Sequence, residues 1–301
     1  MAQPRRISKR FVPLRIRLRI AGDASSCYGE AMPELAEVEF FRKQWDDGVG
    51  HRILGVEAVA NRVFRGVDVR LLRQTLKGAT LLDSAAHGKQ MLFRFSKNAW
   101  LGVHLGMTGK LRIVKHNAST AKHDRLVLRQ KQQALVFSDP RQFGRILFAV
   151  SPKAPAWWQR RPPQILSAEF SLDLMSAFLA RHGRAPIKAV LLLQPGFPGI
   201  GNWMADEILW QGGVNPRRRA GSLTATEVRQ LFARTRSITR TAMRTIGGKW
   251  DDPPKNWLLH RRWRRGGHCP RDGTPLRHAT IGGRTTCWCP TCQKELRAAK
   301  S

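Results

Sequence analysis

Acidic residues are scarce in this 301-residue chain. Only 21 Asp and Glu stand against 53 Lys and Arg, which gives a formal net charge of +32 at pH 7. An excess of this size repels itself and opposes compaction unless a polyanion compensates it. Because Lys and Arg are spread along the whole length rather than gathered in one tail, the composition predicts a nucleic-acid-binding protein.

Long apolar runs are also absent. No run approaches the roughly 20 residues that a membrane span requires, so we expect no membrane partner and a cytoplasmic location. The apolar content is nevertheless 42%, and a chain of this length can form two domains with cores of their own.

Cysteine is rare as well, with five in the chain. Four of them fall between Cys269 and Cys292, a clustering typical of a metal site rather than of a disulfide framework. Cys289 and Cys292 have the C-x2-C spacing of a zinc knuckle, and Cys269 faces them across a predicted hairpin. A structural zinc site needs four ligands, and Asp272 stands where a second cysteine of the first pair would be.

The segment 1–31 contains the fifth cysteine, Cys27, and the only tyrosine, Tyr28. It is basic and has no apolar core of the secretory kind, so it is either a transit-like peptide or upstream sequence from a misassigned start codon; we favour the second. The next residues, MPELAEVE from Met32, read like the beginning of a protein. We therefore expect residues 1–31 to be a leader that is absent from the mature chain.

The period of the apolar residues changes along the rest of the chain. Short β-type runs with turn residues between them predict an antiparallel β-sandwich in residues 32–150; the runs are 52–60, 79–86, 90–96, 99–106, 110–114, 125–130, 134–139 and 145–150. A Pro- and Arg-rich linker, 151–168, follows. Residues 169–248 have helical periodicity, with helices expected at 171–183, 186–194, 203–213 and 222–248. A basic tail, 249–301, ends in the cysteine cluster, so the fold class is α+β.

Several short stretches are candidates for chemistry, each with an ordinary structural alternative. Asn202 opens a helix after a glycine-rich turn, where free amides suit a phosphate, although a plain helical hairpin also fits. Met107, Arg141 and Phe143 lie at strand-edge turns, where apolar tips with a cation suit a wedge in a base stack, although the apolar two are more often core residues. Lys89, after a glycine turn, would normally be a surface lysine.

Taken in order, the motifs resemble the formamidopyrimidine-DNA glycosylase / endonuclease VIII family of base-excision repair enzymes. The resemblance runs from Met32 to about Gln293 and is closest to the formamidopyrimidine branch. It rests on MPELAEVE, HGKQMLF, HLGMTGKL, DPRQFGR, GIGNWMADEIL and GGRTTCWCPTCQ. It implies a β-sandwich catalytic domain, a helix-two-turns-helix domain and a zinc-finger-like hairpin.

The resemblance implies a bifunctional DNA glycosylase and abasic-site lyase. Pro33 would be the nucleophile, exposed once the methionine is removed, Glu34 the general acid/base, and Lys89 the holder of a phosphate near the lesion. The implied reaction passes through a Schiff base to β- and δ-elimination. The implied partner is double-stranded DNA with oxidised bases or abasic sites, bound by a monomer associated with the nucleoid.

The resemblance also implies DNA-binding roles. Asn202 and Arg284 would clamp the flanking phosphates, while Met107, Arg141 and Phe143 would fill the gap left by the flipped nucleotide. The segment between Gly248 and Cys269 looks shorter than the one that covers an oxidised purine in the family. An oxidised-pyrimidine specificity and a non-catalytic DNA-binding relative therefore stay open as alternatives.

The same family resemblance implies one Zn²⁺ in the hairpin. We rank Cys269, Asp272, Cys289 and Cys292 first as its ligands, since a carboxylate oxygen is an accepted zinc ligand. Cys287 is the alternative ligand, because it lies on the same strand face as Cys289. A hairpin that folds without metal is the third option.

Overall fold

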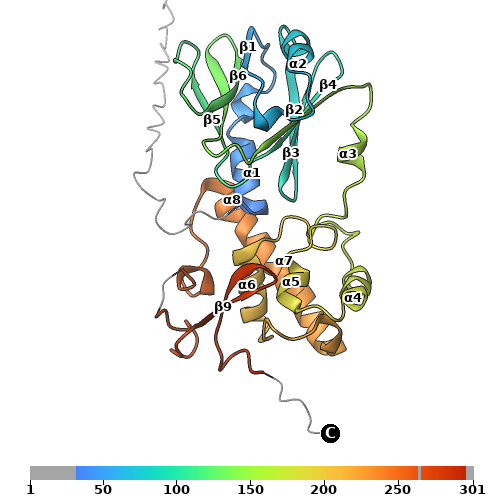
Figure 1. Ribbon diagram of the computed structural model, residues 1–301, viewed down its shortest axis with the longest axis vertical. Coiled ribbons are helices and arrows are strands. Elements are labelled where there is room, and N and C mark those ends of the chain that lie inside the picture. Colours follow the sequence, from blue (N-terminus) through green and yellow to red (C-terminus); the bar gives the residue numbers. More distant parts are fainter. Residues whose placement is uncertain (1–31, 264–265, 296–301) are drawn as a thin grey trace, which may run out of the picture.

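The computed structural model describes residues 32–263 and 266–295, which form a β domain stacked on a helical domain (Figure 1). The predicted leader, 1–31, with Cys27 and Tyr28, lies outside the described residues. Within the ranges that are described, no helix is long and apolar enough to cross a membrane.

The N-terminal domain is the predicted antiparallel sandwich. Every strand ladder in it is antiparallel. One sheet has the order β1 (Gly55–Ala58), β6 (Asp124–Arg129), β7 (Gln133–Ser138), β5 (Lys110–Lys115), and the other has the order β2 (Leu81–His87), β3 (Gln90–Phe95), β4 (Ala99–His104), β8 (Arg145–Val150). Alternate residues such as Phe93, Phe95 and Phe137 are fully buried between the sheets, which is the burial that period-2 patterning predicts.

Helices complete this domain at its edges. They are α1 (Leu35–Lys43), the 3-10 turns η2 (Asp46–Gly48) and η3 (Arg62–Phe64), and α2 (Val69–Leu76). The sequence reasoning left α2 unassigned. Its signals were present, since Asp68 caps the helix by accepting from the amides of Arg70 and Leu71, and Leu72 and Leu76 are buried four residues apart.

The C-terminal domain holds the predicted helices and hairpin. Its elements are α3 (Ala156–Gln159), α4 (Leu172–Arg181), α5 (Ile187–Leu191), α6 (Asn202–Gln211), η4 (Ala220–Ser222), α7 (Ala225–Arg244), α8 (Ile246–Lys249), η5 (Leu258–His260), β9 (Arg277–Ile281) and β10 (Arg284–Trp288). The expected serine cap is confirmed, because Ser171 Oγ accepts from the Leu174 amide. Thr224 and Glu227 form a capping box at the start of α7. The short helix α3 lies inside the predicted linker.

The expected Gly-Gly stop of the last long helix is wrong. The α7 helix ends at Arg244, and the short helix α8 contains both glycines. Gly247 packs closely there, since a Cβ at this position would lie 3.3 Å from the carbonyl oxygen of Ala36 on α1. The chain leaves the helix only at Trp250, whose φ is +63°.

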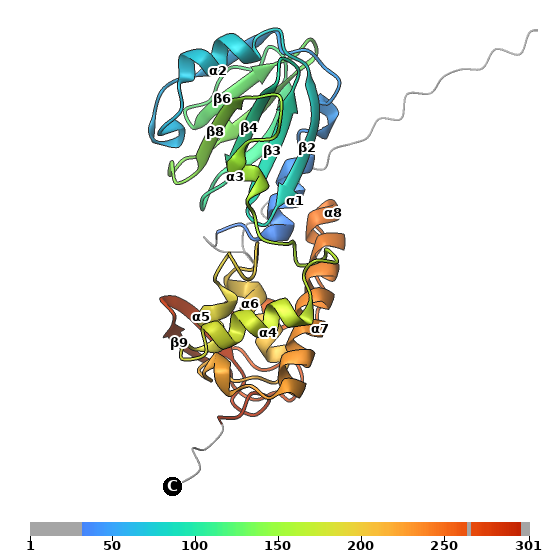
Figure 2. The ribbon, with the colours of Figure 1, turned by 90° about the vertical axis from the view of Figure 1, so that its right-hand side faces the viewer.

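The first helix joins the two domains. Leu35 and Ala36 are part of the core of the helical domain, whereas Val38 is part of the core of the sandwich. Figure 2 shows α1 beside α8 at the junction, and the two helices are in contact. Residues 33 and 34 therefore lie where the β domain meets the helical domain.

Candidate active site

Glu34 is buried at the junction, with 1% of its surface exposed. Its Oε2 accepts from the amides of Gly201 at 2.8 Å and Met204 at 3.2 Å, and its Oε1 accepts from the amide of Trp203 at 2.8 Å. These amides form the start of α6, where unpaired N–H groups and the helix dipole favour an anion. The site was expected to offer free amides to a phosphate; the anion there is instead the carboxylate of Glu34.

The environment of Glu34 acts on its pKa in both directions. Burial raises the pKa above its usual value, while the charge of Lys89 and the amides of Trp203 and Met204 oppose the rise. Burial likewise lowers the pKa of Lys89, and the charges of Glu34 and Glu37 raise it. The acid and the lysine predicted from the sequence are thus close enough to change each other's proton affinity.

A close backbone contact holds Lys89 beside Glu34. Lys89 follows Gly88 in the β2–β3 turn, and Gly88 lies against Gly199 of the turn before α6. Gly199 has φ +88°, and a Cβ on it would lie 2.5 Å from Leu35 Cβ and 3.0 Å from Gly88 Cα. The Leu35 amide also donates to the Gly199 carbonyl at 3.1 Å. Only glycine permits this approach of three segments.

Glu37 is a site residue that the sequence reasoning missed. Its Oε1 accepts from Trp203 Nε1 at 2.9 Å, and its buried Oε2 has no hydrogen-bond partner in the described structure. Burial, and then the charge of Glu34, raise the pKa of Glu37 to about 7. Its spacing of three residues from Glu34, on the same side of α1, was the available signal.

The predicted wedge residues lie on two adjacent loops. Phe143 is 39% exposed, and the Arg141 guanidinium lies 4.9 Å from the centre of its ring. The other loop carries Met107, which is half-buried, and touches the first at Gly106, where a Cβ would lie 2.4 Å from the Phe143 carbonyl carbon. Neither Met107 nor Phe143 is therefore a core residue.

Asp139 joins these loops, and it too was missed. It is fully buried, and it accepts from Thr108 Oγ1 and from the Gly144 amide, both at 2.8 Å. A cavity of about 270 Å³ opens beside the loop that carries Phe143, with Phe143, Arg65, His104 and Arg145 in its lining. Burial lowers the pKa of His104, and neighbouring cations lower it further.

Asn202 and Arg284 come together where the hairpin meets α6. Asn202 Nδ2 donates to the Thr285 carbonyl at 2.8 Å, so one of its two amide hydrogens is used within the protein. The hairpin turn packs on α5, because a Cβ at Gly282 would lie 2.6 Å from Ala189 Cβ. Arg284 is exposed at the start of β10, and its charge lowers the pKa of Lys89. The predicted phosphate ligands thus face one region.

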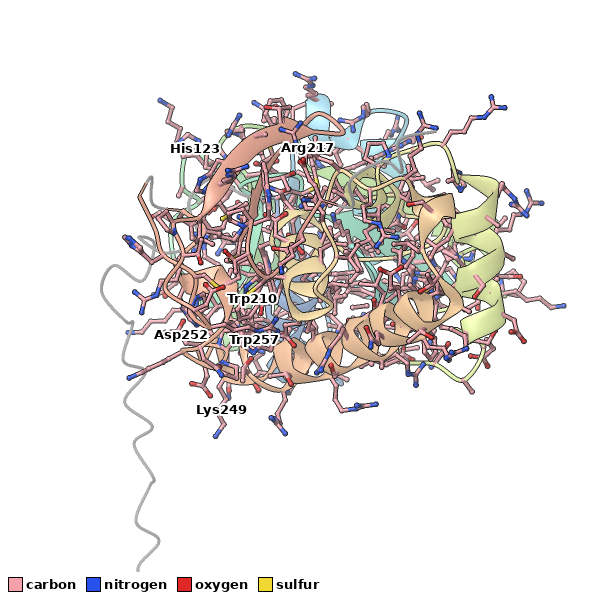
Figure 3. The ribbon with its side chains drawn as sticks, turned by 90° about the horizontal axis from the view of Figure 1, so that it is seen from below. His123, Trp210, Arg217, Lys249, Asp252 and Trp257 are labelled. Carbon is pink, nitrogen blue, oxygen red and sulfur yellow. The ribbon has the colours of Figure 1, made fainter. Side chains whose placement is uncertain are left out.

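The hairpin lies on one side of the helical domain. The Arg217 guanidinium lies 5.4 Å from the ring centre of Trp288 on β10, and Arg217 lies in the upper part of Figure 3. Lys249, at the end of α8, lies in the lower part of the same view. Trp210 lies between them in that view and donates from Nε1 to Cys269 Sγ at 3.4 Å.

Four side chains that could bind a metal ion lie close together near the hairpin. One atom each from Cys269, Asp272, Cys289 and Cys292 lies within 4.8 Å of all the others. This is the set ranked first from the sequence, and three thiols with a carboxylate are a donor set that zinc accepts. Cys287 does not belong to this group of the described residues, although it is buried in the same apolar cluster as Cys269 and Cys289.

Comparisons with known proteins agree with this geometry. A family model for the formamidopyrimidine-DNA glycosylase N-terminal domain matches residues 32–146, and one for the formamidopyrimidine-DNA glycosylase H2TH domain matches residues 162–252. The formamidopyrimidine-DNA glycosylase of Xanthomonas campestris is 33% identical over 280 residues, which cover 87% of this chain and 100% of that protein. The enzyme of Pelotomaculum thermopropionicum is 30% identical over 275 residues, covering 87% and 99%.

Solved structures show the same likeness. The Lactococcus lactis enzyme in complex with DNA containing an abasic site is 26% identical, with a TM-score of 0.79, and covers 87% of this chain and all of that one. The wild-type L. lactis enzyme with DNA containing an oxidised pyrimidine gives a TM-score of 0.80 at 27% identity. The chain therefore belongs to the formamidopyrimidine-DNA glycosylase family.

Proposed function

We propose that the protein is a bifunctional DNA glycosylase and abasic-site lyase that removes oxidised bases from double-stranded DNA, with Pro33 as its nucleophile. Family membership supports the glycosylase activity. The observation that carries the rest is the placement of Glu34, which is buried next to Pro33 on the start of α6 with Lys89 in electrostatic reach. An acid, a cation and an N-terminal amine at one point suit chemistry at a sugar beside a phosphate.

The proposed chemistry requires Pro33 to be the first residue. A free α-amine has a pKa of about 7.7–8.0, so a useful fraction is unprotonated near neutral pH. An internal proline nitrogen is an amide and cannot attack carbon. The N-terminal family model begins to match at residue 32, which supports an active form that starts at Pro33 after removal of Met32.

The proposed reaction has three stages. The Pro33 nitrogen attacks C1′, the glycosidic bond breaks, and the base leaves with the bonding electrons and a proton. Glu34 donates a proton to the ring oxygen as the sugar opens, so that an iminium forms at C1′. The iminium withdraws electrons while the C2′ proton leaves and the 3′ C–O bond breaks. A second elimination removes the C4′ proton and breaks the 5′ C–O bond, and water then hydrolyses the iminium to release the Pro33 amine.

The remaining residues would bind the DNA. Lys89, Asn202 and Arg284 would hold phosphates around the lesion, and Arg141 and Phe143, with Met107, would occupy the space of the extruded nucleotide. Neutralising several phosphates releases counterions, so affinity should fall steeply with salt. An affinity that does not depend on salt would contradict this role of the cations.

Zinc fits the hairpin site as a structural ion. Cys269, Cys289 and Cys292 would bind it as thiolates and Asp272 as a carboxylate. When bound, the ion supplies a cross-link that joins the two ends of the hairpin; the sugar chemistry needs only Pro33 and its neighbours.

Reductive trapping tests the proposal. A form that begins at Pro33 and one that begins at Met1 are each mixed with borohydride and a duplex that contains an abasic site. We expect a covalent adduct only with the Pro33 form, since only that form has a free secondary amine. An adduct with neither form would leave a non-catalytic DNA-binding relative as the better description.

Substrate choice is tested separately with the Pro33 form. Duplexes containing 8-oxoguanine, a ring-opened purine and thymine glycol are compared by kcat/KM. We expect cleavage of the purine lesions, as the names of the curated relatives suggest. Cleavage restricted to thymine glycol would assign the oxidised-pyrimidine specificity instead.

A further inference from the structure

Three charged side chains are buried together beneath the hairpin. Asp206 on α6 accepts from Lys188 Nζ at 2.5 Å through Oδ1, and from Arg262 Nη2 at 2.6 Å and Nε at 3.1 Å through Oδ2. The side chains of Lys188 and Asp206 are 0% exposed and that of Arg262 is 2% exposed. Two cations thus share one carboxylate out of reach of water.

This ion cluster is directly attached to the hairpin. Asp206 Oδ2 also accepts from the Cys287 amide at 3.1 Å. Lys188 Nζ donates to the Asn202 carbonyl at 2.7 Å, and Asn202 Nδ2 donates to the Thr285 carbonyl. Strand β10 is therefore fixed to α6 at two residues, 285 and 287. Arg284 directly precedes the first of these two residues.

Stability alone does not account for such a cluster. Burying charges costs several kcal/mol per ion, and apolar replacements of similar volume are often neutral or stabilising. Hydrogen-bonded ions, unlike apolar groups, fix the orientation of their partners, because a carboxylate accepts from donors at fixed angles. Here the donors come from α5, from the segment after η5 and from β10.

We propose that Asp206 is a positioning residue: with Lys188 and Arg262 it sets how β10 lies on α6, and so holds Arg284 and Asn202 in the arrangement that binds DNA phosphates. The inference rests on the proposed role of Arg284 in DNA binding. Asp206 itself is 1% exposed and acts only through the hairpin.

The test measures how much Arg284 contributes to DNA affinity in two backgrounds of the Pro33-start protein. One background is wild type, and the other carries Lys188→Met, Asp206→Leu and Arg262→Met, which removes the buried charges together. Affinity for a duplex with an uncleavable abasic analogue is measured with and without Arg284→Ala. In wild type we expect a loss of about tenfold, as for a charge-assisted hydrogen bond, and in the apolar background a loss below twofold.

The salt dependence gives a second readout that fold stability does not change. The slope of log Kd against log salt should decrease by about 0.9 on loss of one phosphate contact. We expect this decrease from Arg284→Ala in wild type, and expect it already in the apolar background with Arg284 intact. Thermal unfolding confirms that each variant is folded.

A matched control lies next in the chain. Glu207 is also a fully buried carboxylate on α6, but its hydrogen bonds within the described residues come from the Leu259 amide and from Gln211 rather than from the hairpin. In a Glu207→Gln background the loss caused by Arg284→Ala should stay at about tenfold. Should the apolar background fail to fold, the loss of affinity caused by Arg284→Ala is measured in an Asp206→Asn background instead, and this result decides whether Asp206 positions Arg284.

The possible failures are distinguishable. An equal loss from Arg284→Ala in the wild-type and apolar backgrounds would overturn the positioning role and leave the proposed clamp intact. No loss in wild type would overturn both the clamp and its positioning, while the trapping result for Pro33 would still stand or fall separately. A reduced loss in the Glu207→Gln background as well would show a general effect of disturbing α6, which also refutes the specific role of Asp206.

Discussion

Replacing Glu37 by glutamine should stabilise the protein at pH 8 far more than at pH 5. Glutamine keeps the acceptor for Trp203 Nε1 and removes a carboxyl group whose second oxygen is buried without a partner. Burial and the charge of Glu34 raise the pKa of Glu37 from 4.5 to about 7. The folded protein therefore resists ionisation of Glu37 more strongly than the unfolded chain does.

The size of the effect follows from linkage. A carboxyl with a raised pKa binds its proton more tightly in the folded state, so its contribution to stability is complete below pH 4.5 and is lost as pH rises towards 7. Each pKa unit corresponds to 1.36 kcal/mol, so the loss between pH 5 and pH 8 is about 2.5 kcal/mol. Glu37→Gln lacks this titration, and it should gain that amount relative to wild type over the same interval.

Chemical denaturation of the Pro33-start protein at pH 5, 6, 7 and 8 measures this difference. Glu39→Gln is the control on the same helix; it loses an ion pair with Arg42 and should be less stable than wild type at both ends of the range. An advantage of Glu37→Gln that is equal at pH 5 and pH 8 would refute the reasoning. If Glu37→Gln is less stable than wild type only at pH 8, the ionised carboxylate of Glu37 stabilises the folded protein. That result would require a partner for the carboxylate that the burial argument leaves out.

Three further outcomes can be checked. Gly199→Ala should destabilise the protein by about 3 kcal/mol in denaturation experiments, since it combines an unfavourable φ with overpacking; an unchanged midpoint would show that the junction yields easily. Asp139→Ala should cost about 1–3 kcal/mol by the same measurement, because it leaves a buried amide unpaired; a neutral result would contradict that. Asp272→Ala should lower the zinc content measured by atomic emission while Cys287→Ser leaves it unchanged, and zinc loss only in Cys287→Ser rejects the ligand set.

The fold was largely predictable because its signals are local. Each of the eight apolar runs expected as strands overlaps a strand of the sandwich. Helix α2 was missed because a short amphipathic segment with an aspartate cap lies among strands. The Gly-Gly pair was misread because the short helix α8 contains both glycines and Gly247 packs against α1, and a tertiary contact of that kind leaves no local pattern.

The site residues that belong to family motifs could be predicted from the sequence. Family motifs pointed to Glu34 and Lys89, but not to the partners that hold them in place. The amides that bind Glu34 belong to residues more than 160 positions later in the chain. Glu37 and Asp139 were missed because their importance lies in burial and in long-range hydrogen bonds, neither of which a spacing reveals.

The start of α6 connects the proposed catalytic residue Glu34 to the residues proposed to bind DNA. The same helix end offers its amides to Glu34 and carries Asn202, whose side chain donates to the strand of Arg284. A shift of the hairpin on α6 would therefore move Asn202 and the amides that bind Glu34 together. Because those amides oppose the rise in the pKa of Glu34 that burial causes, any loosening of them would raise that pKa further. The proposed binding of phosphates at the hairpin would thus be coupled, through one turn of helix, to the proton affinity of Glu34.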